Sequence, residues 1–330
     1  MTHDTSGEDS LIARYFKPLA TDPGAFGLID DAAIIKAEGC DLVVNTDAIV
    51  EGVHYLPDDP PDMVARKALR VNLSDLAAKG AVPAGFLLTL ALRERNEAWL
   101  SAFARGLGED AKSFGCPLLG GDTVSTPGPV MISITAWGRV PVGRMVHRFG
   151  AQPGDRVMVT GTIGDASLGL AILQGGAAAA ALANEPAARD MLIGRYRVPQ
   201  PRNALAGVVR DFATASMDVS DGLAGDLTKL CAASAVTADI HLSKVPTSPA
   251  AASLLACGAA ELGAMISGGD DYEILCTVPE SRCAAFLSEA ARVGVAVTEV
   301  GVVMAGATDP RFLDGQGQPV ALKRLSFSHF

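Results

Sequence analysis

Several features that mark large classes of protein are absent from this chain of 330 residues. It has no tract rich in lysine and arginine, and its formal net charge is −10, so nucleic acids and anionic membranes are not expected partners. No apolar run reaches the length of about eighteen residues that a membrane-spanning helix needs. The opening segment MTHDTSGEDSLIARYF lacks the basic-then-apolar order of a signal peptide. We therefore expect a cytoplasmic protein.

Common cofactor and nucleophile motifs are missing as well. The six cysteines are scattered without a C-x-x-C pair, so we expect reduced, mostly buried thiols and no zinc site. There is no G-x-x-x-x-G-K-[ST] phosphate loop, and no G-x-S-x-G or Ser-His-Asp set. The segment 106–111 matches G-x-G-x-x-A, but it lies within a predicted helix and does not follow a strand. Phosphate chemistry, if present, needs a different kind of site.

What is present predicts a two-domain fold in which strands and helices alternate, of the α/β or α+β class. The chain is longer than most single domains, and a segment rich in turn signals at 149–155 places the boundary between 1–150 and 151–330. The alanine-rich segment 175–186 is read as flanking a helix at the surface. Strands are predicted at 41–46, 84–92, 130–140, 156–160, 215–219, 272–278 and 295–303, and helices at 63–79, 97–114, 165–173, 204–211, 223–233 and 281–293.

Short aspartate motifs stand at the ends of apolar segments. Burying a lone carboxylate is costly, so a strand that ends in Asp places the carboxylate at a sheet edge, where several such ends can converge on one cleft. Oxygen ligands from Asp and Thr suit Mg²⁺, which substrate phosphates usually complete. The set therefore predicts a metal–phosphate site. Its members are Asp30-Asp31-Ala32-Ala33, Asn45-Thr46-Asp47, Asn72-Leu73-Ser74-Asp75, Gly120-Gly121-Asp122-Thr123, Asp218-Val219-Ser220-Asp221-Gly222 and Gly268-Gly269-Asp270-Asp271-Tyr272-Glu273.

Each of these aspartates also has a structural interpretation. A single Asp before a helix is more often an N-cap than a ligand, and Asp221 has that setting. Asp75 lies inside an apolar helix, one turn before Lys79, and a salt bridge between the two is its alternative. Six motifs together favour the metal–phosphate site over a series of separate caps.

Four other features have both a structural and a functional interpretation. The turn 161–165 joins a predicted strand to a helix and is either an anion site or, as we favour, a tight packing turn. His54 lies in a loop of mixed polarity and is either structural or a ligand contact. Arg148 is either a surface arginine or a fork for a phosphate. Phe327, near the C-terminus, either packs on the core or stacks on a flat ring.

Together the motifs resemble those of the thiamine-monophosphate kinase family, in order and rough spacing, over residues 27 to 330. The corresponding segments are Gly27 to Ala33, Asn45-Thr46-Asp47 with Val50-Glu51-Gly52-Val53-His54-Tyr55, Asn72 to Asp75 with Gly80-Ala81-Val82-Pro83, Gly120 to Thr123, Asp218 to Leu223, Gly268 to Glu273, and Phe327 with the ending Ser328-His329-Phe330.

The resemblance implies a two-domain fold shared with aminoimidazole ribonucleotide synthetase and a homodimer in which the N-terminal sheets pair. It implies transfer of the γ-phosphoryl group of ATP to thiamine monophosphate, directly and with several Mg²⁺ ions. The implied metal ligands are Asp30, Thr46, Asp47, Asp75, Asp122, Asp218 and Asp221. The implied ATP contacts are Gly121, Asp122, Arg148 and Ser220, and the implied contacts to thiamine monophosphate are His54, Asp270 and Phe327.

Three positions depart from the family pattern. Ile29 replaces a glycine, Asn45 replaces a threonine whose metal contact an amide oxygen can take over, and Asp270 replaces a glutamate that is one methylene longer. The alternative functions are aminoimidazole ribonucleotide synthesis, by an enzyme of the same superfamily, and ATP binding by a regulatory protein without turnover. The intact aspartates argue against the second.

Overall fold

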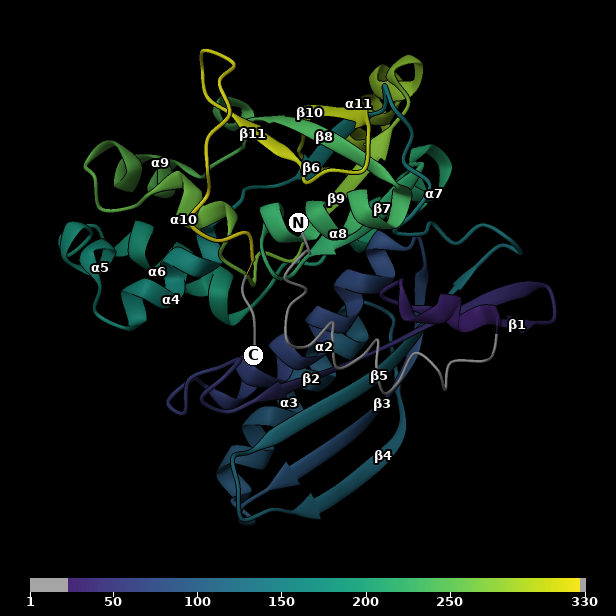
Figure 1. Cartoon of the computed structure of the whole chain (residues 1–330). Helices are drawn as coiled ribbons and strands as arrows, with labels where there is room; N and C mark the ends of the chain where they lie inside the picture. The colour runs from purple at the N-terminus through teal and green to yellow at the C-terminus, as the bar shows by residue number, and fades with distance from the viewer. Residues whose placement is uncertain (1–22, 327–330) are drawn as a thin grey trace.

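A computed structural model describes residues 23–326 of the chain. The N-terminal domain is a five-stranded sheet with α2 and α3 on one face (Figure 1). Its strand order is β1-β2-β5-β3-β4, and only β3 and β4 run parallel. The elements are η3 (Pro23–Leu28), β1 (Ala33–Ala37), β2 (Cys40–Val50), α2 (Pro61–Ala78), β3 (Val82–Leu92), α3 (Glu97–Ser113), β4 (Leu118–Ser125) and β5 (Met131–Val140).

The C-terminal domain is built on a six-stranded sheet of order β11-β8-β10-β6-β9-β7, in which only β11 and β8 run parallel. α8 packs on one face, α7 and α11 pack on the other, and α4, α5, α6 and α9 form a helical group beside the sheet. The elements are β6 (Arg156–Thr160), α4 (Asp165–Leu173), α5 (Ala177–Ala181), α6 (Pro186–Arg197), η4 (Asn203–Leu205), α7 (Ala206–Phe212), β7 (Ala215–Val219), α8 (Leu223–Ser234), β8 (Val236–His241), η5 (Leu242–Lys244), α9 (Pro249–Ala256), α10 (Leu262–Ile266), β9 (Glu273–Val278), η6 (Glu280–Arg282), α11 (Cys283–Arg292), β10 (Val297–Ala305) and β11 (Arg311–Leu313).

Helix α2 lies between the two domains. One side covers β2 and β5, while other residues contact β7, β9, α6 and α7 of the second domain. The helix is therefore buried nearly all round, and polar side chains that would face water on a surface helix are enclosed. The buried polar residues of α2 and its C-cap are Lys67, Asn72, Ser74, Asp75 and Lys79.

The predicted fold class is confirmed: two domains, each with a mixed sheet and packed helices. The first sheet ends at Val140 and the second begins at Arg156, so the predicted division at residue 150 falls between them. Every predicted strand and helix is present within a few residues. Within residues 23–326, no helix is long and apolar enough to cross a bilayer.

The sequence interpretation missed β1, β4, α6, β8, α9, α10 and β11, and it missed the short α5 within 175–186. Strand β4 shows the reason most clearly. Gly120 and Gly121 resemble a turn in sequence, but they adopt extended backbone (φ 157° and 158°) inside a parallel edge strand. A Cβ at Gly121 would lie 1.9 Å from the carbonyl oxygen of Leu88. Close strand packing therefore explains this glycine.

Candidate active site

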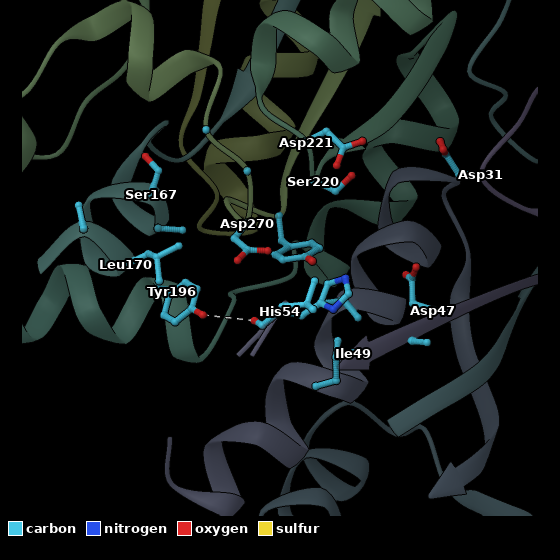
Figure 2. Close-up of a pocket in the computed structure, with 18 of the residues that line it drawn as sticks. Asp31, Asp47, Ile49, His54, Ser167, Leu170, Tyr196, Ser220, Asp221 and Asp270 are labelled. Atoms are coloured by element: carbon cyan, nitrogen blue, oxygen red, sulfur yellow. Dashed lines mark hydrogen bonds between the residues drawn. The ribbon is translucent and has the colours of Figure 1, made fainter. Parts of the chain in front are cut away.

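A cavity of about 560 Å³ lies between the two domains. Figure 2 shows that different kinds of side chain line the two ends of this cavity. Asp31, Asp47 and Asp221 lie at one end, and Leu170 and Tyr196 lie at the other. The cavity thus has an acidic end and a largely apolar end, which suits a ligand that joins charged groups to a flat organic part. Six residues predicted from the sequence line it: Asp47, His54, Arg148, Ser220, Asp221 and Asp270.

Carboxyl groups gather at the acidic end, with Asp47 on the cavity wall and Asp75 and Asp218 buried behind it. Burial and the negative charge of Asp221 raise the pKa of Asp47 to about 6, against a hydrogen bond from Asp75 that lowers it. Burial, with Asp218 and Asp47 close by, raises the pKa of Asp75 well above its usual value. Burial raises the pKa of Asp218 to about 7, against a hydrogen bond with Ser74. These groups repel one another when ionised, so a cation among them is favoured.

The donor set at this end fits magnesium. Asn45 Nδ2 donates to Asp75 Oδ2 over 2.8 Å, whereas its Oδ1 is buried without a hydrogen-bond partner. An unpaired oxygen beside buried carboxylates offers the hard ligands that Mg²⁺ prefers. Within residues 23–326, no three acidic, histidine or cysteine side chains are close enough to hold an ion by themselves. An ion held here would therefore need amide or phosphate oxygens or water to complete its coordination.

Two basic residues balance the acidic end. Lys229 Nζ lies 2.5 Å from Asp221 Oδ2 and 3.2 Å from Asp226 Oδ1. Burial would lower the pKa of Lys229, but the two carboxylates raise it above its usual value. Arg148 forms an ion pair with Asp31. Both cations line the cavity, so phosphate oxygens there can meet Lys and Arg as well as a metal ion.

Asp30, a predicted metal ligand, lies behind this wall, and its side chain is fully buried. Its Oδ1 is 2.8 Å from Lys79 Nζ, and its Oδ2 accepts from the backbone N–H of Arg148 over 3.1 Å. Burial would raise the pKa of Asp30, yet Lys79 and these hydrogen bonds hold it below its usual range. Its neighbour Asp31 lines the cavity. In this structure Asp30 anchors the chain, because its carboxylate is already satisfied by protein.

His54 follows β2 at the middle of the cavity (Figure 2). Its Nδ1 accepts from the backbone N–H of Val50 over 3.0 Å. A nitrogen that accepts has no proton of its own, so Nε2 carries the proton of the neutral ring. His54 can therefore donate a hydrogen bond through Nε2.

Asp270 and Glu273 belong to one motif but occupy different environments. Asp270 lines the cavity, its side chain is 25% exposed, and its backbone has a left-handed φ of 73°, which Asp tolerates better than most residues. Glu273 is fully buried and accepts from Arg195 Nη2 and Thr160 Oγ1, each over 2.6 Å, and from Arg202 Nε over 2.6 Å. Asp270 is thus open to a ligand, whereas Glu273 belongs to the internal packing.

The glycine turn before α4 is a packing turn, as favoured from the sequence. Asp271 accepts from the backbone N–H groups of Gly164 (2.8 Å) and Ala166 (3.4 Å). A carboxylate of the chain itself thus occupies the N-terminus of α4. Asp165, the first residue of the helix, accepts from Thr162 Oγ1 over 2.5 Å.

Three predicted residues are not brought to the cavity. Thr46 is exposed and hydrogen-bonds to Ile134 and Thr135. Successive residues of a strand point to opposite faces of the sheet, and its neighbour Asp47 points to the face that lines the cavity. Gly121 and Asp122 lie on exposed β4, three strands from β2 and so roughly 14 Å from Asp47. Phe327 lies outside the described residues.

The sequence interpretation also missed residues that line or support the cavity. Tyr196 lines the apolar end, and its hydroxyl donates to the His54 carbonyl over 3.4 Å. Lys67 and Lys79 are buried behind the wall, and Lys229 lines it. The available signal was weak: Lys67 and Lys79 occupy a helix otherwise rich in apolar residues, where a surface lysine is the usual expectation.

Comparison with known proteins relates this geometry to a family. Residues 29–140 match the model of the AIR synthase related protein N-terminal domain, and residues 152–310 match that of the C-terminal domain. A thiamine-monophosphate kinase from Caulobacter vibrioides is 43% identical over 324 residues, which cover 96% of this chain and 89% of the relative. The chain belongs to the thiamine-monophosphate kinase family. The family predicted from the motifs is thereby confirmed.

Solved structures agree with the assignment to this family. A thiamine-monophosphate kinase from Stenotrophomonas maltophilia is 34% identical, with a TM-score of 0.77, and the match covers 96% of this chain and 98% of that one. The structure described as AaThiL complexed with AMPPCP and TMP is 30% identical, with a TM-score of 0.79, and covers 93% of this chain and 97% of that one.

Proposed function

We propose that this protein transfers the γ-phosphoryl group of ATP to thiamine monophosphate and so forms thiamine diphosphate. The observation that carries the proposal is the cavity between the domains, acidic at one end and apolar at the other, with His54 and Asp270 between them. The names of the relatives, and a related structure complexed with AMPPCP and TMP, support the same reaction.

In this proposal the acidic end holds the phosphates of ATP. Asp47, Asp75, Asp218 and Asp221, with the unpaired Asn45 Oδ1, would bind magnesium. Bound magnesium neutralises phosphate charge and orients the phosphates for transfer. Thr46 and Asp30 are left out of the proposed ligand set, because Thr46 faces away from the cavity and Asp30 is fully buried behind its wall, paired with Lys79.

Arg148, Lys229 and Ser220 contact the phosphates at the same acidic end of the cavity. The two cations offset the negative charge of a phosphate, and the Ser220 hydroxyl can donate a hydrogen bond to it. A phosphate oxygen of the acceptor forms a bond to the γ-phosphorus of ATP. The bond from the γ-phosphorus to the β–γ bridging oxygen breaks, and ADP leaves. The acceptor phosphate is already ionised, so the transfer requires no general base, and positioning and charge stabilisation carry it.

Thiamine monophosphate occupies the other part of the cavity. His54 donates from Nε2 to the acceptor, Asp270 presents its carboxylate to the partly cationic organic part, and Leu170 and Tyr196 flank the rings. Phe327 remains a predicted stacking contact. Its part in the proposal rests on the motif alone, since it lies outside the described residues.

We propose in addition that the protein is a homodimer. The predicted contributor β5 lies in the middle of its sheet, so its backbone is already paired on both edges. Exposed apolar side chains gather instead on β3 and β4, and an uncovered edge strand with such side chains favours pairing with a second copy. If Gly121 and Asp122 contact ATP, they do so from this interface. The exposed apolar side chains of β3 and β4 are Val82, Leu87, Leu118, Leu119 and Val124.

The test is conversion of thiamine monophosphate to thiamine diphosphate with ATP and Mg²⁺, followed by chromatography. We expect product only with both cosubstrates and Mg²⁺, and none from unphosphorylated thiamine. Asp221→Asn is expected to lower kcat/KM at least about a hundredfold. The control Asp211→Asn removes an exposed carboxylate paired with Arg144 and is expected to keep activity. Product formation in excess chelator, or none under any condition, would refute the proposal.

A further inference from the structure

Lys67, on α2, is buried behind the middle of the cavity, with its side chain 1% exposed. Lysine is almost never enclosed to this degree unless its charge is paired. Lys67 is not among the residues that line the cavity, and neither the sequence motifs nor the proposed reaction gives it a role.

The ammonium group of Lys67 contacts three residues that do line the cavity. It lies 2.9 Å from Asp270 Oδ2, donates to the His54 carbonyl oxygen over 2.7 Å, and lies 3.9 Å from the centroid of the Tyr196 ring. The partners belong to three segments: the loop after β2, helix α6, and the loop before β9. The His54 carbonyl and the Tyr196 ring fix the ammonium in place, because one is a strong acceptor and the other attracts a cation through its face.

The loop that carries Asp270 needs such a support. Asp270 and Tyr272 both have left-handed backbone, with φ of 73° and 49°. Residues other than glycine adopt this conformation at some cost in energy. Backbone hydrogen bonds fix the main chain of the loop, from Asp270 N–H to the Ser220 carbonyl and from Tyr272 N–H to the Val219 carbonyl, each over 2.8 Å. The carboxylate direction of Asp270 is fixed separately, by Lys67.

We propose that Lys67 is a positioning residue for the thiamine monophosphate subsite, which acts by holding the Asp270 carboxylate in the direction that faces the substrate. This inference rests on the proposed function. Lys67 belongs to the N-terminal domain and Asp270 to the C-terminal one, so the pair also fixes how the two domains frame the substrate.

Replacement of Lys67 by Met tests the role, because Met keeps most of the apolar length and removes the charge. The Asp270 carboxylate is 25% exposed to the cavity, so it stays hydrated in the variant and the fold is expected to survive. Released from its partner, Asp270 samples several directions. We expect KM for thiamine monophosphate to rise about tenfold, with KM for ATP and kcat each within about twofold to threefold of the wild type.

The matched control is Arg66→Met, at the preceding position of the same helix. Arg66 pairs with Glu109 and Asp110 of α3, away from the cavity, so both KM values are expected to stay unchanged. If Lys67 served only to cancel charge, its loss would leave the negative charge of Asp270 uncompensated. A substrate with a cationic ring would then bind more tightly, and its KM would fall. An unchanged or lowered KM in folded Lys67→Met therefore overturns the positioning role.

A second comparison uses Asp270→Asn as background. Lys67 acts through Asp270 in this account, so adding Lys67→Met to Asp270→Asn is expected to change KM for thiamine monophosphate by less than about twofold. The same tenfold rise in both backgrounds would show that Lys67 acts independently of Asp270, and would overturn the inference. This comparison also serves if Lys67→Met alone folds poorly, because the double variant removes both charges together.

The wild type separates this inference from the proposed function. If wild-type protein forms no thiamine diphosphate, the proposed function fails and the inference fails with it. If the wild type turns over and the variants behave like Arg66→Met, only the positioning role fails. Thermal unfolding of every variant, measured beside the kinetics, identifies a loss of activity that comes from unfolding.

Discussion

Replacement of Glu273 by Gln is expected to destabilise the C-terminal domain strongly. The Glu273 side chain is fully buried, and it is the ion-pair partner of both Arg195 and Arg202, whose side chains are 13% and 24% exposed. Gln keeps the shape but removes the negative charge, which leaves two guanidinium groups in a nearly closed space. Removing one partner of a buried pair typically costs about 3–5 kcal/mol, and the partial exposure of the arginines places our expectation at about 3 kcal/mol.

The assay is thermal and urea-induced unfolding of the wild type and of Glu273→Gln. For a unit of 150–250 residues, about 3 kcal/mol corresponds to a fall in Tm of roughly 6–12 °C. The matched control is Glu280→Gln in the same domain. Glu280 pairs with Arg156, but its side chain is 71% exposed, so the loss is expected to stay below about 1 kcal/mol.

Equal, small effects of the two substitutions would refute the reasoning, because burial is the difference on which it depends. A large effect of Glu280→Gln would refute it as well. Below the melting temperature, Glu273→Gln is expected to keep its KM for thiamine monophosphate within about threefold of the wild type, since Glu273 does not line the cavity. A selective rise in that KM would mean that Glu273 contacts the substrate.

Three other predictions concern the site and the assembly. Asp47→Asn is expected to lower kcat/KM at least about a thousandfold in the presence of Mg²⁺, because it removes a charged ligand of the acidic end; steady-state kinetics with near-normal values would contradict this. Phe327→Ala is expected to raise KM for thiamine monophosphate about five- to tenfold and to leave KM for ATP unchanged, at about 1.4 kcal/mol per decade; equal weakening of both substrates would mean that Phe327 only packs. Leu119→Lys places a charge on the exposed face of β4 and is expected to shift a dimer toward monomer in light scattering; a wild type that is already an active monomer at micromolar concentration would exclude the dimer.

The part of the site that could be predicted follows from where apolar segments end. Asp47 and Asp221 close such segments, and the structure brings both to one end of the cavity. As single residues, His54 and Arg148 each allowed a structural and a functional interpretation. The order of the motifs favoured the functional one, and both residues line the cavity. The strands and helices that were predicted have an apolar periodicity that matches the layers they form.

The side chain of Thr46 lies away from the cavity, and the sequence already indicates this. Asp47 follows it directly on β2, and neighbouring residues of a strand face opposite sides of the sheet. The two therefore cannot both face the cavity through their side chains. Asp122 lies away from the cavity for a different reason: β4 is the outer strand of the sheet, and no local sequence pattern indicates that strand order.

The buried lysines could not be predicted from the sequence. Lys67 lies in α2 and Lys79 is its C-cap, and both are enclosed because the second domain covers α2. Their partners, Asp270 and Asp30, are separated from them by 203 and 49 positions along the chain (270 minus 67, and 79 minus 30). A pair of this kind is visible only when the domains are placed together.

The most direct test of the central claim follows the terminal phosphate of ATP. Wild-type protein is incubated with Mg²⁺, thiamine monophosphate and ATP labelled at the γ-phosphate, and the products are separated. The account predicts label in the terminal phosphate of thiamine diphosphate, in equal amount to the ADP formed, with no label retained on the protein. Label released as free phosphate, or found on the protein, or absent from thiamine diphosphate while ATP is consumed, would contradict it.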